Sequence, residues 1–529
     1  MGKRIAALLM SLCLLAGCSS DAAPSPSREA TATLDWFVDF SWFTAAWGEN
    51  HVTQAITQQT GTEVVFSSPV GNENETLDAM LQGERLPDLI TLGWWMPQVG
   101  ELIESGRVYP LEELAQRYAP EFFEAASPEV LDWYRQDDGQ VYCYPSASSS
   151  PAAYADGDIA PSNQTFLVRK DLYEALGSPD MTTPEGFADA LRRAKETFPT
   201  VNGYPLLTMG CGEFNERGCS SFSEHLRDLL ALPQERDGQA VDWQTDPEYI
   251  TWLKTFRELI AEGTIGPNIL LDKRQQVSEK LLRGQYFCLI YQWSDMEAEQ
   301  RQLYYENPKG SYIAVDGPKN SAGDNHALSG VGMNGWTVTF ITRDCRDPEK
   351  AIELMSFLMS EEGQKLTALG VEGLDYNWED GVAVPSQEAE NLLRQDYPAY
   401  VATIGADNNY WMLLDNTIQS QWQTASDPAL EQLRAWALSY TVDNTPYEVA
   451  FPPASEAEII NQRAEQLWGE TLPRLLLAAS EEEFDRLISQ YVEQRAQLGW
   501  DKLQQAKTQQ YEINKERLAV IASQQGGEA

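Results

Sequence analysis

Residues 34–93 contain three short apolar segments, LDWFVDF (Leu34–Phe40), TEVVF (Thr62–Phe66) and PDLITLG (Pro87–Gly93). Each has the length of a strand, and a helical pattern separates one from the next, at residues 49–60 and 75–82. Strands that alternate with helices are typical of βαβ units and a mostly parallel sheet. In such sheets ligands bind at loops beyond the carboxyl ends of the strands. We therefore predict an α/β fold with a binding site at these loops.

Tryptophans occupy two of the loops. Trp42 follows the first segment, and Trp94 and Trp95 follow the third. A strand has already delivered its core residues by that point, so these indoles are candidates for contact with a ligand. The pattern leaves open whether one of Trp94 and Trp95 packs inward.

The alternation continues along the chain. FLVRKDLYEALG (Phe166–Gly177) predicts a short strand and a short helix, YFCLIYQW (Tyr286–Trp293) a strand, and GWTVTFI (Gly335–Ile341) another. Three helices are expected to begin at a polar N-cap followed by proline, a combination favoured at helix starts. These caps are Thr183, Asp246 and Asp347. Beyond residue 385 the pattern is mainly helical, so we predict a helical C-terminal part.

Composition indicates a globular protein and excludes some partners. The chain has 529 residues, 43% of them hydrophobic, with 80 acidic and 38 basic side chains and a formal net charge of −42. This length allows several domains. So negative a charge argues against a nucleic-acid partner, which requires a basic face.

The first residues resemble a bacterial export signal. Lys3 and Arg4 precede an apolar run, Ile5 to Ala16, which would span about 18 Å as a helix and is too short for the ~30 Å membrane core. The run reads as the apolar region of a signal peptide. It ends in LAGC, which resembles a lipobox and implies cleavage before Cys18 and lipidation there; the alternative is an ordinary signal with a chance cysteine. We expect residues 1–17 to be removed and residues 18–30 to form a flexible tether.

The positions of the cysteines and histidines limit which disulfides and metal sites the chain can form. Cys211 and Cys219 lie in one glycine-rich segment and could form a disulfide, or both could remain free thiols. The three histidines are far apart in the sequence, and no CxxC motif occurs. A histidine-based zinc centre is therefore not expected, and we predict neither a metal nor a cofactor.

Several segments, taken in order, resemble a known family. They resemble the extracellular solute-binding proteins of family 1, the substrate-binding lipoproteins of sugar ABC transporters, and within it the long branch that includes the alginate-binding proteins. The segments that carry the resemblance are LPDLITLG (86–93), SGRVYPLEEL (105–114), DDGQVYCYP (137–145), FLVRKDLYEALG (166–177), TTPEGFADALRRAKETFP (182–199), VDGPKNSAG (315–323) and the stretch from Asp347 to Gly381.

The resemblance implies a two-lobe fold of the type II periplasmic-binding-protein class, with a central ligand cleft that closes by hinge bending and a mainly helical C-terminal extension. Lobe 1 would comprise residues 31–150 and 325–400, and lobe 2 residues 151–324 and 401–529. Some alginate-type relatives carry a calcium loop where this chain has residues 177–183. This stretch has too few carboxylates for a Ca²⁺ shell, so we predict no structural calcium there.

Candidate site residues follow from the chemistry of a sugar. A saccharide offers apolar faces and a ring of hydroxyls, which call for aromatic platforms and polar side chains. The stacking candidates are Trp42, Trp94, Trp95, Trp293 and Trp336, with Trp378 as a further candidate at the rim. The hydrogen-bonding candidates are Asp39, Glu213, Asp295 and Asn334.

The expected function is that of a lipid-anchored, substrate-binding component of an ABC importer. It would capture a carbohydrate, most simply an oligosaccharide, and deliver it to the permease subunits. It would act as a monomer on the extracytoplasmic face of the cell membrane, without enzymatic activity. Two alternatives stay open: the same fold could bind a peptide or another polar solute, or the protein could be a surface glycoside hydrolase, which needs two carboxylates about 5–10 Å apart.

Overall fold

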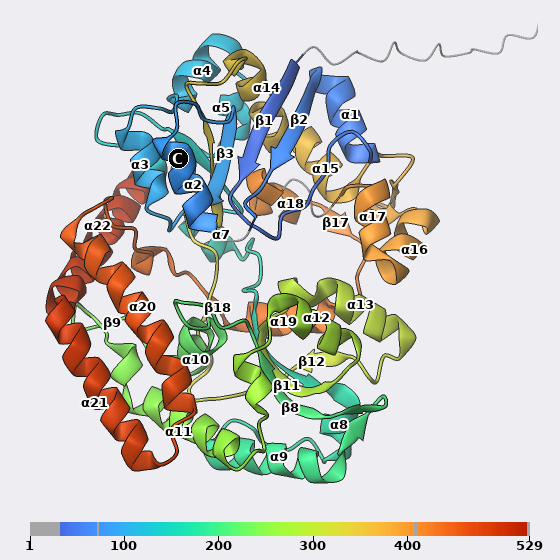
Figure 1. Cartoon of the computed structure of the whole chain (residues 1–529). Coiled ribbons are helices and arrows are strands. Elements are labelled where there is room, and N and C mark those ends of the chain that lie inside the picture. Colours follow the sequence, from blue (N-terminus) through green and yellow to red (C-terminus); the bar gives the residue numbers. More distant parts are fainter. Residues whose placement is uncertain (1–31, 71–72, 407–410, 526–529) are drawn as a thin grey trace, which may run out of the picture.

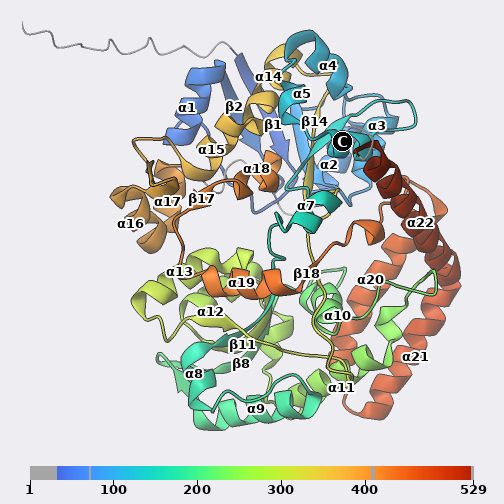
Figure 2. The same ribbon diagram turned by 180° about the vertical axis from the view of Figure 1, so that it is seen from behind.

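The computed structural model describes residues 32–70, 73–406 and 411–525. Two α/β lobes lie one above the other, and three long helices run along one side of both (Figure 1). Figure 2 shows the same arrangement from behind. The proposed lipidation site at Cys18 and the tether lie outside the described residues.

The first lobe is built on a five-stranded sheet with strand order β2-β1-β3-β14-β4. β1 pairs in parallel with both β2 and β3, whereas β14 is antiparallel to β3 and β4. Its strands are β1 (Ala32–Val38), β2 (Thr62–Ser67), β3 (Leu89–Gly93), β4 (Cys143–Ser146) and β14 (Thr337–Ile341). The three apolar segments predicted from residues 34–93 are thus neighbours in one sheet.

A polar ladder crosses the interior of this sheet. The indole N–H of Trp36 donates to the Thr91 hydroxyl at 2.8 Å, and that hydroxyl lies 2.7 Å from the hydroxyl of Thr339. All three side chains are buried. Buried polar groups need such partners, so the ladder helps fix the register of β1, β3 and β14.

The second lobe contains a four-stranded sheet with strand order β12-β5-β11-β8. β11 is parallel to β8 and antiparallel to β5, and β5 is antiparallel to β12. Its strands are β5 (Gln164–Arg169), β8 (Leu207–Cys211), β11 (Tyr286–Gln292) and β12 (Tyr312–Ala314). Every residue of β5 is buried, as expected for a central strand covered on both faces.

The predicted helix starts are present. Thr183 and Asp347 accept hydrogen bonds from the third residue of their helices, and Asp246 accepts one from the second. The helices before the C-terminal group are α1 (His51–Thr60), α2 (Glu73–Gln82), α3 (Gln98–Glu104), α4 (Leu111–Tyr118), α5 (Phe122–Ala125), α6 (Pro128–Tyr134), α7 (Pro151–Asp156), α8 (Lys170–Ala175), α9 (Pro184–Thr197), α10 (Leu226–Leu229), α11 (Pro247–Ala261), α12 (Arg274–Leu282), α13 (Glu297–Glu306), α14 (Pro348–Met359), α15 (Glu361–Leu369), α16 (Gln387–Gln395), α17 (Tyr397–Thr403), α18 (Asn416–Ser420) and α19 (Glu431–Tyr440).

Short strands make up the smaller sheets. They are β6 (Thr200–Val201), β7 (Tyr204–Pro205), β9 (Glu235–Arg236), β10 (Gln239–Ala240), β13 (Leu328–Ser329), β15 (Tyr376–Glu379), β16 (Val382–Pro385), β17 (Gln423–Thr424) and β18 (Thr441–Val442).

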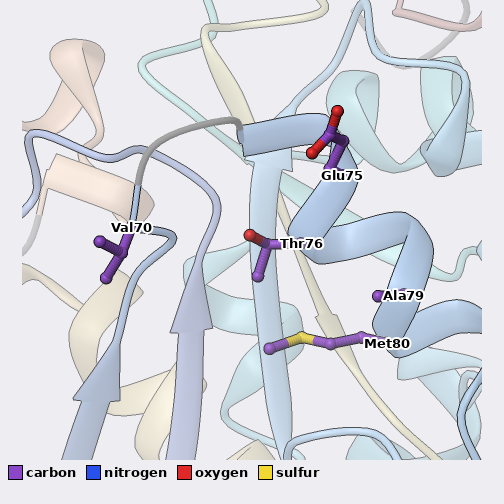
Figure 3. Close-up of a pocket in the computed structure, with 5 residues that line it drawn as sticks. All are labelled: Val70, Glu75, Thr76, Ala79 and Met80. Atoms are coloured by element: carbon purple, nitrogen blue, oxygen red, sulfur yellow. The ribbon is translucent and has the colours of Figure 1, made fainter.

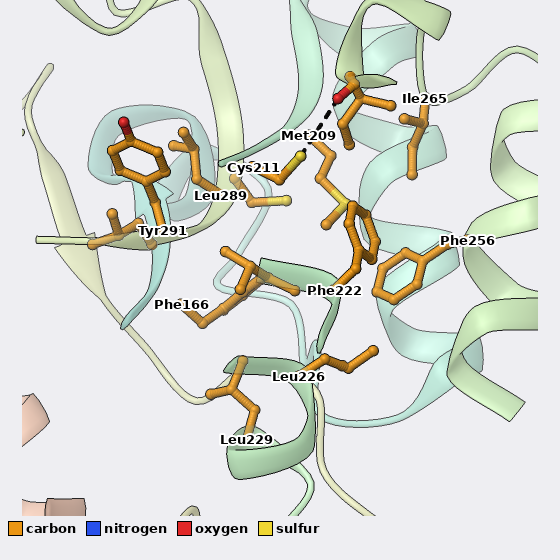
Figure 4. Packing of buried hydrophobic residues seen from close by; sticks show 14 of the residues in the cluster. Phe166, Met209, Cys211, Phe222, Leu226, Leu229, Phe256, Ile265, Leu289 and Tyr291 are labelled. Carbon is orange, nitrogen blue, oxygen red and sulfur yellow. Dashed lines mark hydrogen bonds between the residues drawn. The ribbon is translucent and has the colours of Figure 1, made fainter. Parts of the chain in front are cut away.

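Each lobe has its own hydrophobic core. The core of the first lobe draws on residues 34–144 and 333–413 and on Ile521. That of the second lobe draws on residues 166–328 and 430–491. Figure 4 shows part of the second core, where Phe166, Phe222 and Phe256 meet Met209 and Leu289.

The two cores show how the chain passes between the lobes. Within the described residues, it leaves one core for the other between residues 144 and 166, 328 and 333, 413 and 430, and 491 and 521. The predicted division placed residues 401–529 in the second lobe. Ile404, Leu413 and Ile521 instead pack in the core of the first lobe, because the chain returns to the second lobe only after residue 413 and its last helix reaches back to the first.

The C-terminal helices are α20 (Glu456–Leu476), α21 (Glu481–Leu498) and α22 (Trp500–Gln525). α20 packs closely on the second lobe, where a Cβ added at Gly469 would lie 2.0 Å from the carbonyl oxygen of Glu216. α22 continues upward beside the first lobe, and its C-terminal end lies against that lobe in both views. There the Arg517 guanidinium donates to the carbonyl of Trp133 at 2.8 Å. The helical extension therefore contacts both lobes.

Candidate functional site

Three aromatic rings at strand ends of the first lobe form a group that we call the aromatic platform: Phe40, Trp42 and Trp336. The rings of Trp42 and Trp336 are stacked, with centroids 6.0 Å apart and planes 15° apart. Phe40 stacks on Trp336 at 5.5 Å. Trp42 remains 36% exposed. Offset stacked rings of this kind give a rigid apolar surface, and here part of it is accessible to a ligand.

Local backbone geometry holds Trp336 in this place. The preceding residue, Gly335, has φ +68°, and a Cβ there would lie 2.3 Å from the carbonyl oxygen of Ser146. Only glycine fits such a left-handed position against a neighbouring backbone. The N–H of Trp336 then donates to the same Ser146 carbonyl at 2.8 Å. Trp336 is therefore fixed at the edge of β14 next to β4.

The second lobe brings Arg274 to the aromatic platform. Arg274 begins α12, and its guanidinium carbon lies 5.5 Å from the ring centroid of Trp42. A cation at this distance over an indole is attracted by the ring's quadrupole. Its Nη2 is also 3.1 Å from Oδ1 of Asp295, which follows β11. This contact places residues of both lobes in one site.

Glu213 completes the polar side of the site. Its carboxylate accepts from the Lys273 ammonium at 2.7 Å and from the backbone N–H of Arg274 at 3.0 Å. We call Glu213, Lys273, Arg274 and Asp295 the polar corner. It faces the aromatic platform through the contact between Arg274 and Trp42.

The two carboxyl groups of the polar corner differ in their electrostatics. Burial raises the pKa of Glu213, but the Lys273 ammonium and the Arg274 N–H outweigh it, so the net pKa is lowered. Burial raises the pKa of Asp295, and the Arg274 guanidinium offsets only part of that effect. Asp295 is the more buried of the two, so desolvation weighs more there, and it has a single guanidinium contact where Glu213 has two donors.

The predicted indoles do not all join this site. Trp94 and Trp95, after β3, form their own edge-to-face pair with centroids 6.1 Å apart. Trp95 is 40% exposed, and its ring leaves no room for a side chain at Gly93, where a Cβ would lie 2.6 Å from it. Trp94 is half-buried and packs against the core of the first lobe, which is the inward packing that the sequence left open.

Trp293 does not lie where the sequence predicts. It is 7% exposed and belongs to the core of the second lobe, and its indole N–H donates to the Ser162 carbonyl at 2.7 Å. The Arg434 guanidinium lies 5.3 Å from its ring centroid. A position at the end of a strand made it a stacking candidate, but core packing covers the ring, and the structure does not support it as a platform.

Asp39 and Asn334 are also held within the protein. Asp39 is wholly buried at the end of β1. The Asn334 side-chain oxygen accepts from the Trp133 indole at 2.7 Å, and its carbonyl accepts from the Tyr134 hydroxyl at 2.7 Å. Asn334 therefore ties the crossing segment near residue 333 to α6, which is a structural task that the sequence did not indicate.

The remaining predicted residues have other surroundings. Trp378 lies on β15, edge-to-face with Tyr376 and 5.8 Å from the Lys365 ammonium. Cys211 and Cys219 are buried free thiols, so the possible disulfide is not formed in the structure. Both sulfur atoms approach the Gly212 carbonyl oxygen, at 3.2 Å and 3.3 Å.

Sequence reasoning missed Arg274, Lys273 and Phe40. The segment DKRQQ (272–276) opens an ordinary polar helix, and nothing in its pattern marks a contact with the other lobe. A second contact between the lobes was equally hidden: the Arg394 guanidinium of α16 lies 4.4 Å from the Tyr305 ring of α13.

Two further features lie outside this site. An open hollow of about 550 Å³ lies on the first lobe between Val70 and α2, and Figure 3 shows Thr76 and Met80 along it. Across the described part of the chain, no group of three or more metal-ligating side chains is placed to hold an ion. Within residues 177–183, Asp180 accepts from the backbone N–H of Thr182 at 2.9 Å.

No helix among the described residues combines the length and apolar character needed to cross a bilayer.

Solved structures with the same fold are numerous, and their sequences are distant. The calcium-free crystal structure of the alginate-binding protein AlgQ2 matches with a TM-score of 0.69 at 17% identity, covering 92% of this chain and 100% of that one. The substrate-binding protein FusA of S. pneumoniae in complex with kestose gives 0.68 at 15% identity, covering 92% and 99%. An HMO-binding solute-binding protein from Bifidobacterium longum infantis gives 0.64 at 14% identity, covering 92% and 99%.

No curated protein sequence matches the chain. The family model for bacterial extracellular solute-binding proteins matches residues 37–365, which span both sheets and the site between them. The chain therefore belongs to the family of bacterial extracellular solute-binding proteins.

Proposed function

We propose that this protein is the lipid-anchored, substrate-binding component of an ABC importer and that its substrate is a carbohydrate. The observation that carries the proposal is the contact between Trp42 of the first lobe and Arg274 of the second. It brings an aromatic platform and a polar corner together across two separately folded lobes.

The two surfaces suit the two kinds of surface on a sugar ring. The stacked indoles of Trp42 and Trp336 would receive its apolar C–H face, while the carboxylates and guanidinium of the polar corner would bond to its hydroxyls. Two or three stacked rings contribute roughly 0.5–1.5 kcal/mol each. Together with several hydrogen bonds in a site shielded from water, the total would reach about −8 kcal/mol, or micromolar affinity.

Related proteins support the class of ligand. The similar structures include proteins whose names give alginate, kestose and HMO as what they bind. They share the fold at only 14–17% identity, so the ligand class proposed for this chain has to be argued from its own site. The lipobox-like LAGC segment ending at Cys18 supports an anchor on the extracytoplasmic face of the cell membrane. The family supports the permease subunits as partner, and we propose that the protein acts as a monomer.

Closure of the two lobes is the proposed mechanism. A sugar held by Trp42 and Trp336 on one lobe, and by Asp295 and Glu213 on the other, stabilises the arrangement in which the lobes are together. Hinge closure of this kind is a general domain motion. The ligand leaves unchanged, so no catalytic residue is needed.

A binding experiment tests the proposal. Protein that begins at residue 19 would be titrated with a panel of neutral and acidic oligosaccharides and with short peptides, by calorimetry and tryptophan fluorescence. We expect micromolar or tighter binding of one oligosaccharide class and a smaller radius of gyration by small-angle scattering.

Matched variants make the result specific. Trp42→Ala would weaken binding, whereas Trp500→Ala, which removes an indole from the start of α22, would not. Binding of peptides alone would overturn the carbohydrate assignment. Release of reducing ends from an oligosaccharide during the incubation would instead establish a hydrolase.

A further inference from the structure

The charges of the polar corner cancel. Lys273 and Arg274 contribute +2, and Glu213 and Asp295 contribute −2, which gives a formal sum of zero. Each cation has its carboxylate: Lys273 lies 2.7 Å from Glu213, and Arg274 lies 3.1 Å from Asp295. The corner therefore offers several hydrogen-bonding groups and no net charge.

The four side chains nevertheless remain accessible to a ligand. The Arg274 side chain is 50% exposed, that of Lys273 62%, and those of Glu213 and Asp295 36% and 26%. A guanidinium has five N–H donors, and the contact with Asp295 engages only one edge of it. Hydroxyl groups could thus bond to Arg274 and to the carboxylates without breaking either ion pair.

The polar corner suits the carboxylate of an acidic sugar less well than it suits hydroxyl groups. A uronate carboxylate is best bound by an arginine that offers two parallel N–H groups without a competing anion. Here Asp295 already occupies part of Arg274, and Glu213 accepts from both Lys273 and the Arg274 backbone. A uronate would have to displace a carboxylate or lie beside two of them, and the chain's net charge of −42 adds long-range repulsion.

We infer that the polar corner selects uncharged saccharides over uronates, with Asp295 and Glu213 as the residues that determine this specificity. The inference rests on the proposed carbohydrate function and deepens it. The carboxylates compensate Arg274 and Lys273, so these cations serve as hydrogen-bond donors to hydroxyls and not as an anion receptor.

A charge series tests this inference. The probes are matched trisaccharides that differ only in oxidation of C6 to a carboxylate: mannotriose with trimannuronate, cellotriose with its glucuronate counterpart, and galactotriose with trigalacturonate. The proteins are Arg274→Gln, wild type, Asp295→Asn and the double variant Asp295→Asn/Glu213→Gln, whose formal corner charges are −1, 0, +1 and +2. Calorimetry gives both affinities of each pair, and circular dichroism checks that each variant is folded.

We expect wild type to prefer the neutral member of its best pair by at least tenfold. The ratio of uronate to neutral affinity should rise about three- to tenfold with each added positive charge, and this gain should shrink in 0.5 M salt. A merely structural role for the carboxylates would lower both affinities and leave the ratio unchanged, which would overturn the inference. A wild-type preference for a uronate would also overturn it while leaving the proposed function intact, whereas no binding of any saccharide would overturn the proposed function itself.

Discussion

A partly buried glutamate at the junction of the lobes should make the protein less stable as the pH rises. Glu448 follows β18 and lies against the crossing segment near Gly332, where an added Cβ would be 2.9 Å and 3.0 Å from its two carboxylate oxygens. Its Oε2 is buried. The pKa of Glu448 is raised to about 8, chiefly by burial; the nearby Asp443 also raises it, and bonds from Asn334 and Gly332 lower it by less. Glu448 is thus protonated in the folded protein at neutral pH.

The size and sign of the effect follow from this shift. An unfolded glutamate titrates near 4.5 and the folded one near 8, so between these values the folded state binds the extra proton and stability falls as pH rises. At 1.36 kcal/mol per pKa unit the loss is about 3 kcal/mol by pH 7 and about 5 kcal/mol once pH exceeds 8. Glu448→Gln keeps the shape and cannot ionise, so it should escape this loss.

Urea unfolding at pH 4.5 to 8.5, followed by circular dichroism, measures the difference between Glu448→Gln and wild type. We expect the variant's relative stability to climb by about 3 kcal/mol between pH 4.5 and 7 and to keep climbing to pH 8.5. The control is Glu196→Gln on the exposed face of α9, which makes the same chemical change outside the junction and should not reproduce this climb. A flat difference for Glu448→Gln as well would refute the reasoning.

Three further predictions concern the two lobes. Trp336→Ala should lower the affinity for the bound saccharide by about five- to tenfold in calorimetry, since it removes half of the indole stack; unchanged affinity would remove Trp336 from the site. Ile521→Ala should cost about 2–4 kcal/mol of unfolding free energy, because Ile521 is buried in the core of the first lobe. It should also speed amide exchange in the last turns of α22; unchanged exchange there would show that other residues hold these turns on the first lobe. At Asp88, burial acts to raise the pKa, but Arg346 and the backbone N–H of Asp35 lower it by more, so its stabilisation exists above about pH 4 and is lost in acid. Asp88→Asn should therefore cost about 1.5–3 kcal/mol at pH 7 and progressively less as the pH falls below about 4, and a cost that does not change with pH would contradict this.

Local sequence signals predicted the elements well because each is set by nearby residues. The segment LDWFVDF predicted a strand that the structure places at Ala32–Val38, and Thr183-Pro184 predicted the start of α9. Strand ends also indicated Trp42 and Trp336 as candidates for ligand contact, which remains a prediction; their stacking joins the loop after β1 to the start of β14. These predictions needed only periodicity, capping and the direction of strands.

Contacts between distant segments could not be predicted in the same way. Trp293 and Trp42 both follow strands, yet one is in a core and the other is exposed, because the outcome depends on what the rest of the fold places over each ring. Arg274 meets Trp42 only because two lobes fold separately and then face each other. The mainly helical pattern beyond residue 385 likewise predicts helices in this part of the chain, but not which lobe the final turns of α22 contact.

The junction between the lobes is far more firmly built than the contact across the site, and this contrast fits a protein that opens and closes. At the junction, Met333 donates to the Thr445 hydroxyl at 3.1 Å, and Asn514 of α22 donates to the Glu448 carbonyl at 2.7 Å. β13 and β18 pair beside them. Across the site, by contrast, Arg274 and Trp42 form a partly exposed cation–π contact, which is worth about 0.5–1 kcal/mol. Separating the platform from the polar corner therefore costs little, whereas disturbing the junction breaks several hydrogen bonds. A ligand that bridges Trp42 and Asp295 with a few kcal/mol of binding energy is then sufficient to decide between the open and the closed arrangement.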